Sequence, residues 1–153
     1  MINKTNSIRI LEKENISHSI HTYPVSAWQS QDGAADESDL SGITVAKKIG
    51  AEPERVFKTL VTRGDKEGIN IFCIPVTEEL NLKKAAVASD NKKIEMIKEK
   101  ELLPLTGYVK GGCSPIGMKK KYPTYIDETA QLFDEIYISA GVRGMQVRLK
   151  PRI

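Results

Sequence analysis

The chain has 153 residues, of which 40% are hydrophobic and 28% charged, and its formal net charge is +3. This length and composition predict one globular domain spanning 1–153, exclude a disordered chain, and require no disulfide or metal staple. The N-terminus lacks an apolar signal core and no apolar run is long enough to cross a bilayer, so we expect a cytoplasmic protein with no membrane partner. Because the net charge is small, a contact with nucleic acid must rely on local clusters of basic residues.

The first 50 residues predict two short helices and one strand. An N-cap residue and apolar spacing predict a helix over 4–14, and β-compatible residues predict a strand over 18–23. A second helix is predicted over 44–49 and ends at Gly50. Between these elements, residues 26–41 are rich in small, polar and acidic side chains, so we expect a mobile acidic loop there.

A β-hairpin is predicted next, with strands over 56–62 and 69–76. The first strand has apolar residues on both alternating faces, which is typical of a strand covered on both sides. Lys58 lies on one of these apolar faces. Its ammonium group either reaches out to an edge or enters a partly buried polar pocket, where it must find partners or lose basicity. Cys73 in the second strand fits as a small core residue.

The second half of the chain predicts helical segments over 80–88, 98–103 and 128–133 and strands over 124–127, 135–139 and 145–149. The helix over 98–103 is expected to end near Pro104, because the residue before a proline avoids helical backbone angles. Strands interspersed with short helices predict a mixed α/β (α+β) fold, in which a curved, barrel-like sheet surrounded by short helices holds a cleft.

Few residues are candidates for metal binding. The chain has only two cysteines, Cys73 and Cys113, and two histidines, His18 and His21. The histidines stand three apart in a predicted strand and therefore face opposite sides, and no C-x-x-C pair is present. We interpret both cysteines as reduced cytosolic thiols. The sequence thus predicts no metal site and no cofactor.

The most distinctive stretch is 110–121, with the sequence K-G-G-C-S-P-I-G-M-K-K-K. Its glycines let another molecule approach the backbone closely, so amides from about Gly112 to Ser114 are predicted to face an anion or a polarised carbonyl. The alternative is a tight turn followed by a solvated run of lysines. A nucleotide-binding phosphate loop is excluded, because the second glycine of its G-x-x-x-x-G spacing is followed by Met-Lys instead of Lys and then Ser or Thr.

Five motifs occur together and in order: V-F-K-T-L at 56–60, L-K-K-A-A at 82–86, T-G-Y at 106–108, G-G-C-S-P-I-G at 111–117 and I-S-A-G-V-R-G at 138–144. On these motifs, which are spread over nearly the whole chain, the sequence resembles the YbaK/EbsC family. Proteins of that family are similar to the editing domain of bacterial prolyl-tRNA synthetases. The resemblance implies trans-editing, which is the hydrolysis of misacylated tRNA, most often Cys-tRNA(Pro). It leaves open whether prolyl-tRNA synthetase is a partner.

The resemblance also implies roles for single residues. Lys58 stands where the family keeps its essential pocket lysine, and Gly111 is the first glycine of the loop that approaches the aminoacyl group. Tyr23 and Ser139 stand where the family has a tyrosine and a serine in the pocket wall. We therefore predict catalytic roles for Lys58, Gly111 and Gly112, and substrate contacts for Tyr23, Cys113, Ser114 and Ser139. The acidic loop over 26–41 is longer than in some relatives, so the resemblance does not determine which residues form the rim of the pocket and contact tRNA there.

The sequence offers no credible nucleophile and base for ester hydrolysis. Cys113 lacks a partner histidine, so we interpret it as a packed residue rather than as a nucleophile. In the Cys-tRNA(Pro) deacylases that the chain resembles, the substrate's own thiol attacks its ester carbonyl and releases a thiolactone. The protein then has only to orient the group, stabilise the oxyanion with loop amides and hold the terminal adenosine, with Lys58 steadying the substrate.

Basic clusters are candidates for contacts with tRNA phosphates. Lys119, Lys120 and Lys121 follow the glycine loop, and further lysine pairs stand at 83–84 and 92–93. Either they contact phosphates around the mouth of the pocket or they form a solvated face. Two function classes therefore stay open: an aminoacyl-tRNA deacylase, and a non-catalytic tRNA- or synthetase-binding module of the same fold. A lysine in an apolar strand beside an intact glycine loop favours the deacylase.

Overall fold

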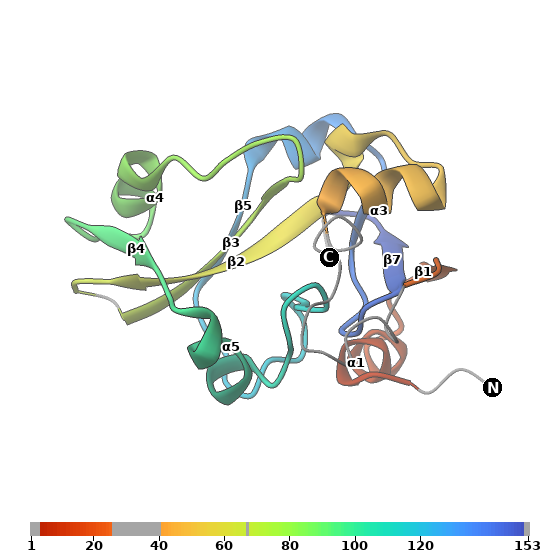
Figure 1. Ribbon diagram of the computed structural model, residues 1–153, viewed down its shortest axis with the longest axis horizontal. Helices are drawn as coiled ribbons and strands as arrows, with labels where there is room; N and C mark the ends of the chain where they lie inside the picture. Colours follow the sequence, from red (N-terminus) through yellow and green to blue (C-terminus); the bar gives the residue numbers. More distant parts are fainter. Residues whose placement is uncertain (1–3, 26–40, 67, 152–153) are drawn as a thin grey trace.

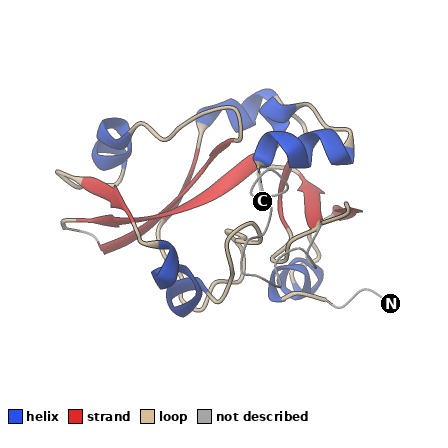
Figure 2. Cartoon of the chain, in the orientation of Figure 1, coloured by secondary structure: helices blue, strands red, loops and turns tan. Residues whose placement is uncertain are grey.

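The computed structural model describes residues 4–25, 41–66 and 68–151. The helical elements are α1 (Asn6–Lys13), α3 (Gly42–Ile49), α4 (Leu82–Ala88), α5 (Glu99–Thr106) and the 3-10 helices η2 (Pro53–Arg55) and η3 (Glu128–Leu132). The strands are β1 (His18–Thr22), β2 (Phe57–Gly64), β3 (Gly68–Pro75), β4 (Ile94–Met96), β5 (Thr124–Ile126), β6 (Ile136–Ser139) and β7 (Met145–Leu149). The helices lie at the periphery of the strands (Figure 2).

The strands form two sheets with the orders β4-β2-β3-β5 and β1-β7-β6 (Figure 1). The β2–β3 hairpin is antiparallel, whereas β5 pairs with β3 in parallel. One isolated bridge, between Val56 and Tyr137, joins the two sheets. The predicted mixed α+β class is confirmed, but the sheet does not close into a barrel, because this single bridge is the only pairing between the sheets in the described residues.

The pleat of the β1-β7-β6 sheet separates an apolar face from a polar one. Paired positions on one face, such as Ile138 and Val147, belong to the main core together with Ile8 and Leu11 of α1. The opposite face includes Tyr137, which packs against α3 in a smaller core. Because side chains alternate along a strand, Ser139 and Gln146 lie on the same face as Tyr137. This polar face is the one available to a functional site.

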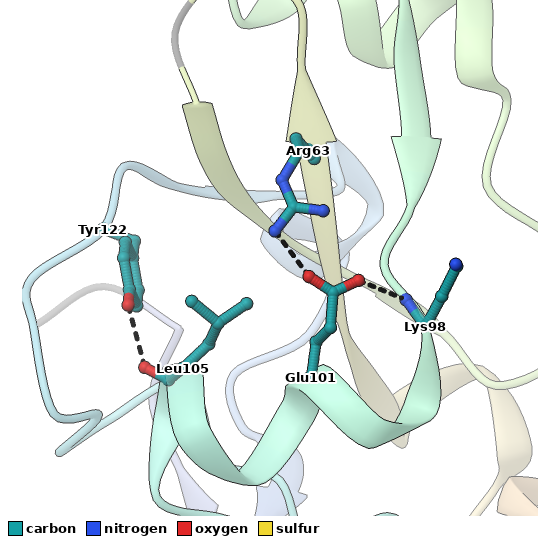
Figure 3. Close-up of polar contacts among 5 residues, drawn as sticks. All are labelled: Arg63, Lys98, Glu101, Leu105 and Tyr122. Carbon is teal, nitrogen blue, oxygen red and sulfur yellow. Dashed lines mark hydrogen bonds and ion pairs between the residues drawn. The ribbon is translucent and has the colours of Figure 1, made fainter.

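The helix predicted over 98–103 continues past the expected end at Pro104, so that boundary is wrong. Pro104 stands in the last turns of α5, where its missing N–H removes only one helical hydrogen bond. The helix ends instead at Gly107, whose φ of 86° is left-handed and whose N–H bonds to Leu103 O at 2.8 Å. Tyr122 also donates its hydroxyl to Leu105 O at 2.8 Å (Figure 3). These bonds satisfy carbonyls that would otherwise stay open at the helix end.

The start of α5 is fixed to the hairpin by a charged side chain. Glu101 accepts the backbone N–H of Lys98 at 3.1 Å and pairs with Arg63 of β2 at 2.6 Å (Figure 3). The hydrogen bond from Arg63 is the main reason that the pKa of Glu101 is lowered. The glycine-rich segment that follows α5 returns to α1, where Asn6 donates to Gly117 O at 2.8 Å.

Other predicted elements agree with the structure. The hairpin, both N-terminal helices and the strands over 18–23, 124–127, 135–139 and 145–149 are present with small shifts of their ends. Cys73 is a buried free thiol, as expected for a core residue. The predicted acidic loop over 26–41 lies outside the described residues except for Ser41, which precedes α3.

Candidate active site

A cavity of about 260 Å³ lies where the start of β2 meets the glycine loop and the ends of β6 and β7. It brings together four residues that the sequence predicted: Lys58, Gly111, Cys113 and Ser139. The remaining polar side chains in its wall are Thr59, Lys110 and Gln146, and the apolar part includes Val45, Val56, Leu60 and Val76. Segments far apart in the sequence therefore converge on one cavity.

Lys58 enters the site because of its place near the first end of β2, where it pairs with Ile74. Its side chain is half-buried and lines the cavity. It makes no hydrogen bond or ion pair with any other residue in the described ranges. Because its side chain lines the cavity, the structure favours a lysine in a pocket over one that reaches out to an edge.

The glycine loop has a fixed conformation on one side of the cavity. Gly111 has a φ of 84°, a left-handed angle that favours glycine. Gly112 is buried, and a Cβ added to it would meet backbone atoms of Val142 and Arg143 at 3.0 Å. Its N–H already bonds to Val109 O at 2.9 Å. The Gly112 amide is therefore engaged within the loop, and this residue packs the loop against the 142–143 backbone; its predicted role toward the substrate stays a prediction.

Two further contacts hold the loop, and sequence reasoning missed both. Arg143 donates Nε–H to Lys110 O at 2.7 Å, directly before Gly111. Tyr108 donates its hydroxyl to Ile116 O at 2.6 Å on the far side of the loop. Together with the packing of Gly112, these bonds fix the backbone on both sides of the segment that lines the cavity. Such pre-set geometry is what electrostatic stabilisation of a reacting group requires.

Of the two serines predicted to contact substrate, Ser139 lies in the cavity wall and Ser114 lies behind it. Ser139 is 8% exposed, lines the cavity and accepts the N–H of Gly141 at 3.2 Å. Ser114 is fully buried, does not line the cavity, and accepts the N–H of Ile116 at 3.1 Å. In this structure the Ser114 hydroxyl shapes the turn from inside the fold, and its predicted contact with substrate stays a prediction.

Cys113 has the properties of a packed thiol. It lines the cavity and packs against the main core. Burial raises its pKa to about 11, so the thiol is protonated at neutral pH. No histidine is among the described residues that line the cavity, so a base that could activate it is missing there. These observations favour packing over a role as nucleophile.

Tyr23 and the lysine cluster Lys119, Lys120 and Lys121 do not line the cavity. Tyr23 is 8% exposed, and its backbone N–H extends the β1–β7 pairing by bonding to Gly144 O at 2.9 Å. The three lysines are exposed. Their placement leaves room for contacts with a larger ligand outside the cavity, but these lysines are not part of the cavity wall.

The comparison with known families identifies the family of the chain. The model of the aminoacyl-tRNA editing domain matches residues 41–153, which include every cavity residue named above. The chain belongs to this family. A protein of Enterococcus faecalis, provisionally named Cys-tRNA(Pro)/Cys-tRNA(Cys) deacylase EbsC, is 47% identical over 148 residues, covering 97% of this chain and 84% of the relative. The resemblance to the YbaK/EbsC family is thereby confirmed.

Two solved structures share the fold of this chain. One is described provisionally as a trans-editing enzyme for prolyl tRNA synthetase; it has a TM-score of 0.77 and 23% identity, covering 99% of this chain and 90% of that one. Another, hypothetical protein APE2540, has a TM-score of 0.81 and 16% identity, covering 97% and 90%. At these identities the likeness concerns the fold.

The charge of the editing-domain cavity distinguishes it from a larger hollow elsewhere. Two lysines and no carboxylate are among its described lining residues. A second cavity of about 830 Å³, between β3, β5, α4 and η3, is lined by five carboxylates and one lysine. The carboxylates are those of Glu54, Glu78, Glu79, Asp127 and Glu128. Only the smaller cavity has a field that suits phosphate or a developing oxyanion.

Within the described ranges, no group of three or more His, Cys, Asp or Glu side chains is placed to hold a metal ion. Nor does that part of the chain contain a helix long and apolar enough to cross a membrane.

Gln146 is one of the polar cavity residues that sequence reasoning missed, together with Thr59 and Lys110. It is 6% exposed, and its Oε1 is closed off from solvent without a hydrogen-bond partner in the described residues. A signal for it existed, because the predicted strands over 135–139 and 145–149 are joined by a short turn. In the resulting register Gln146 stands opposite Ser139, on the same face.

Proposed function

We propose that this protein is a trans-editing aminoacyl-tRNA deacylase and that its substrate is Cys-tRNA(Pro). The observation that carries the proposal is the convergence of Lys58 and the fixed glycine loop on one small, positively charged cavity. Membership of the aminoacyl-tRNA editing domain family supports it, because editing of an aminoacyl-tRNA requires a tRNA substrate. The name of the EbsC relative supports the choice of Cys-tRNA(Pro).

In the proposed reaction the substrate supplies its own nucleophile. Its cysteine sulfur forms a bond to the ester carbonyl carbon, and the bond from that carbon to the ribose oxygen breaks. The thiol proton passes to the leaving ribose oxygen, so the products are a thiolactone and tRNA with a free terminal hydroxyl. This route fits a cavity whose described wall lacks a histidine and whose one thiol, Cys113, is protonated.

The protein's contribution is to position the ester and stabilise charge. Lys58 places a compact cation beside the carbonyl oxygen or the neighbouring phosphate. Gly111, at the cavity wall, lets the acyl group approach the backbone closely. Arg143 and Gly112 hold that backbone in place, so little reorganisation is needed as the oxyanion develops. The exposed cluster Lys119–Lys121 contacts phosphates of the tRNA outside the cavity.

A deacylation assay with Cys-tRNA(Pro), Ala-tRNA(Pro) and Pro-tRNA(Pro) tests the proposal. We expect Cys-tRNA(Pro) to lose its amino acid fastest, because only cysteine carries the attacking thiol. If the protein binds these tRNAs and hydrolyses none of them, it is the non-catalytic binding module. Repeating the assay with and without prolyl-tRNA synthetase determines whether the synthetase delivers the substrate. Since tRNA charging accompanies translation, we propose that the protein acts in the cytoplasm.

A further inference from the structure

Gln146 occupies the centre of a row of polar residues across the β1-β7-β6 sheet. In register it stands between His21 of β1 and Ser139 of β6. It is 6% exposed, lines the cavity, and leaves its carbonyl Oε1 without a partner in the described residues. A buried acceptor without a donor is unfavourable for the free protein and marks a position where a ligand supplies the missing donor.

The other described side chains of the cavity are poor hydrogen-bond acceptors. Lys58 and Lys110 can only donate. Ser139 Oγ already accepts the N–H of Gly141, and Thr59 Oγ1 lies 3.9 Å from Cys73 Sγ. No carboxylate is among the described residues of this wall. The amide oxygen of Gln146 is therefore the side-chain acceptor best suited to a ligand that brings an N–H group.

An aminoacyl ester brings such a group, because its α-amino nitrogen donates hydrogen bonds whether it is protonated or neutral. We propose that Gln146 binds the α-amino group of the aminoacyl ester through Oε1, and thereby orients the ester and selects acyl groups that carry this amine. The inference rests on the proposed deacylase function. Oε1 is closed off from solvent in the free protein, so the proposed contact requires rotation about the last side-chain bond, a change that needs no movement of β7.

The neutrality of the glutamine is part of this role. A glutamate at this position would share the cavity with Lys58 and Lys110. Its carboxylate would also accept from the amine, but it would attract the lysine ammonium groups and reduce the positive field at the ester carbonyl. A neutral amide accepts from the substrate and leaves the charge of Lys58 available.

The test compares two substrates and three forms of the protein. One substrate is Cys-tRNA(Pro), and the other is the same tRNA carrying 3-mercaptopropionate, which keeps the thiol and lacks the α-amino group. The α-ammonium group activates the ester equally in every form of the protein, so the change in preference between forms reports the hydrogen bond. We expect the wild-type preference for the amine-bearing substrate in kcat/KM to exceed that of Gln146→Met, which is similar in length and apolar, by about 10-fold, the effect of one good hydrogen bond to a charged donor. In Gln146→Glu the preference stays while kcat falls.

Each outcome decides between the inferences. Suppose first that the wild-type protein deacylates Cys-tRNA(Pro), so that the proposed function stands. The role of Gln146 is then refuted if Gln146→Met keeps the full preference for the amine-bearing substrate, or if Gln146→Glu loses that preference. If the wild-type protein has no turnover, the proposed function fails. The role of Gln146 is then tested by calorimetry with two non-hydrolysable ligands, amide-linked cysteinyl-adenosine and amide-linked mercaptopropionyl-adenosine. Equal affinities for these two ligands overturn the role of Gln146. Thermal unfolding checks each variant, and Gln146→Glu provides the comparison if Gln146→Met does not fold.

Discussion

Replacing Lys58 with alanine separates catalysis from stability more sharply than any other change in the cavity. The lysine is half-buried and makes no hydrogen bond or ion pair within the described part of the chain, so its removal leaves no partner unsatisfied. We expect the free energy of unfolding to change by no more than about 1 kcal/mol, mostly from lost contacts of the aliphatic stem. Deacylation of Cys-tRNA(Pro) should fall by about 10²–10³-fold, comparable to the loss of one preorganised oxyanion donor.

Single-turnover deacylation and chemical unfolding of the same preparations measure the two effects. Lys66→Ala is the matched control, because this lysine is exposed in the turn of the same hairpin and should change neither. Lys58→Arg should also be impaired, since a planar guanidinium cannot reproduce the compact geometry of an ammonium group. Turnover like that of the wild-type protein in folded Lys58→Ala would refute the argument, and the site would then depend on the glycine loop alone.

Three further predictions follow from the loop and its neighbours. Cys113→Ala should keep most deacylase activity, because the thiol is protonated, with a pKa of about 11, and only packs; loss of turnover in a folded variant would indicate an enzyme nucleophile. Gly112→Ala should lower stability by about 1–3 kcal/mol in urea unfolding and reduce turnover, because its Cβ meets fixed backbone at 3.0 Å. Charge reversal of the cluster Lys119–Lys121 should weaken tRNA binding and reduce its salt dependence, without affecting a short aminoacyl-adenosine substrate; an unchanged salt slope in a binding titration would clear the cluster of this role.

The sequence predicted most elements of the fold because their periodicity is local. The hairpin over 56–76 follows from alternation and turn residues, and the register of β6 and β7 follows from the short turn between them. The division into two sheets does not follow from local patterns. It depends on which strands meet across long stretches of chain, such as the parallel pairing of β5 with β3. The same limit explains the wrong end of α5, where Tyr122 from a later segment supports the turn after Pro104.

The candidate site was predictable where a residue type conflicts with its surroundings. Lys58 is conspicuous in an apolar strand, and the structure places it in the cavity wall. Gln146 has no such conflict, because a glutamine in a half-buried strand is ordinary, and only its unpaired oxygen draws attention. Ser114 shows the opposite case. Its place in the glycine-rich loop predicted a contact with substrate, whereas the fold buries it completely behind the cavity wall.

The arrangement of the glycine loop explains why two separate motifs belong to one site. The G-G-C-S-P-I-G segment and the turn after β6 are about thirty residues apart, yet Gly112 packs on the backbone of Val142 and Arg143. Arg143 then donates to Lys110 O at 2.7 Å, beside the wall of the cavity. A side chain at position 112 would separate the two segments, and loss of Arg143 would release the carbonyl before Gly111. Because a loop that moves cannot stabilise charge at a fixed point, we propose that the turn contributes to catalysis by holding the loop beside the ester.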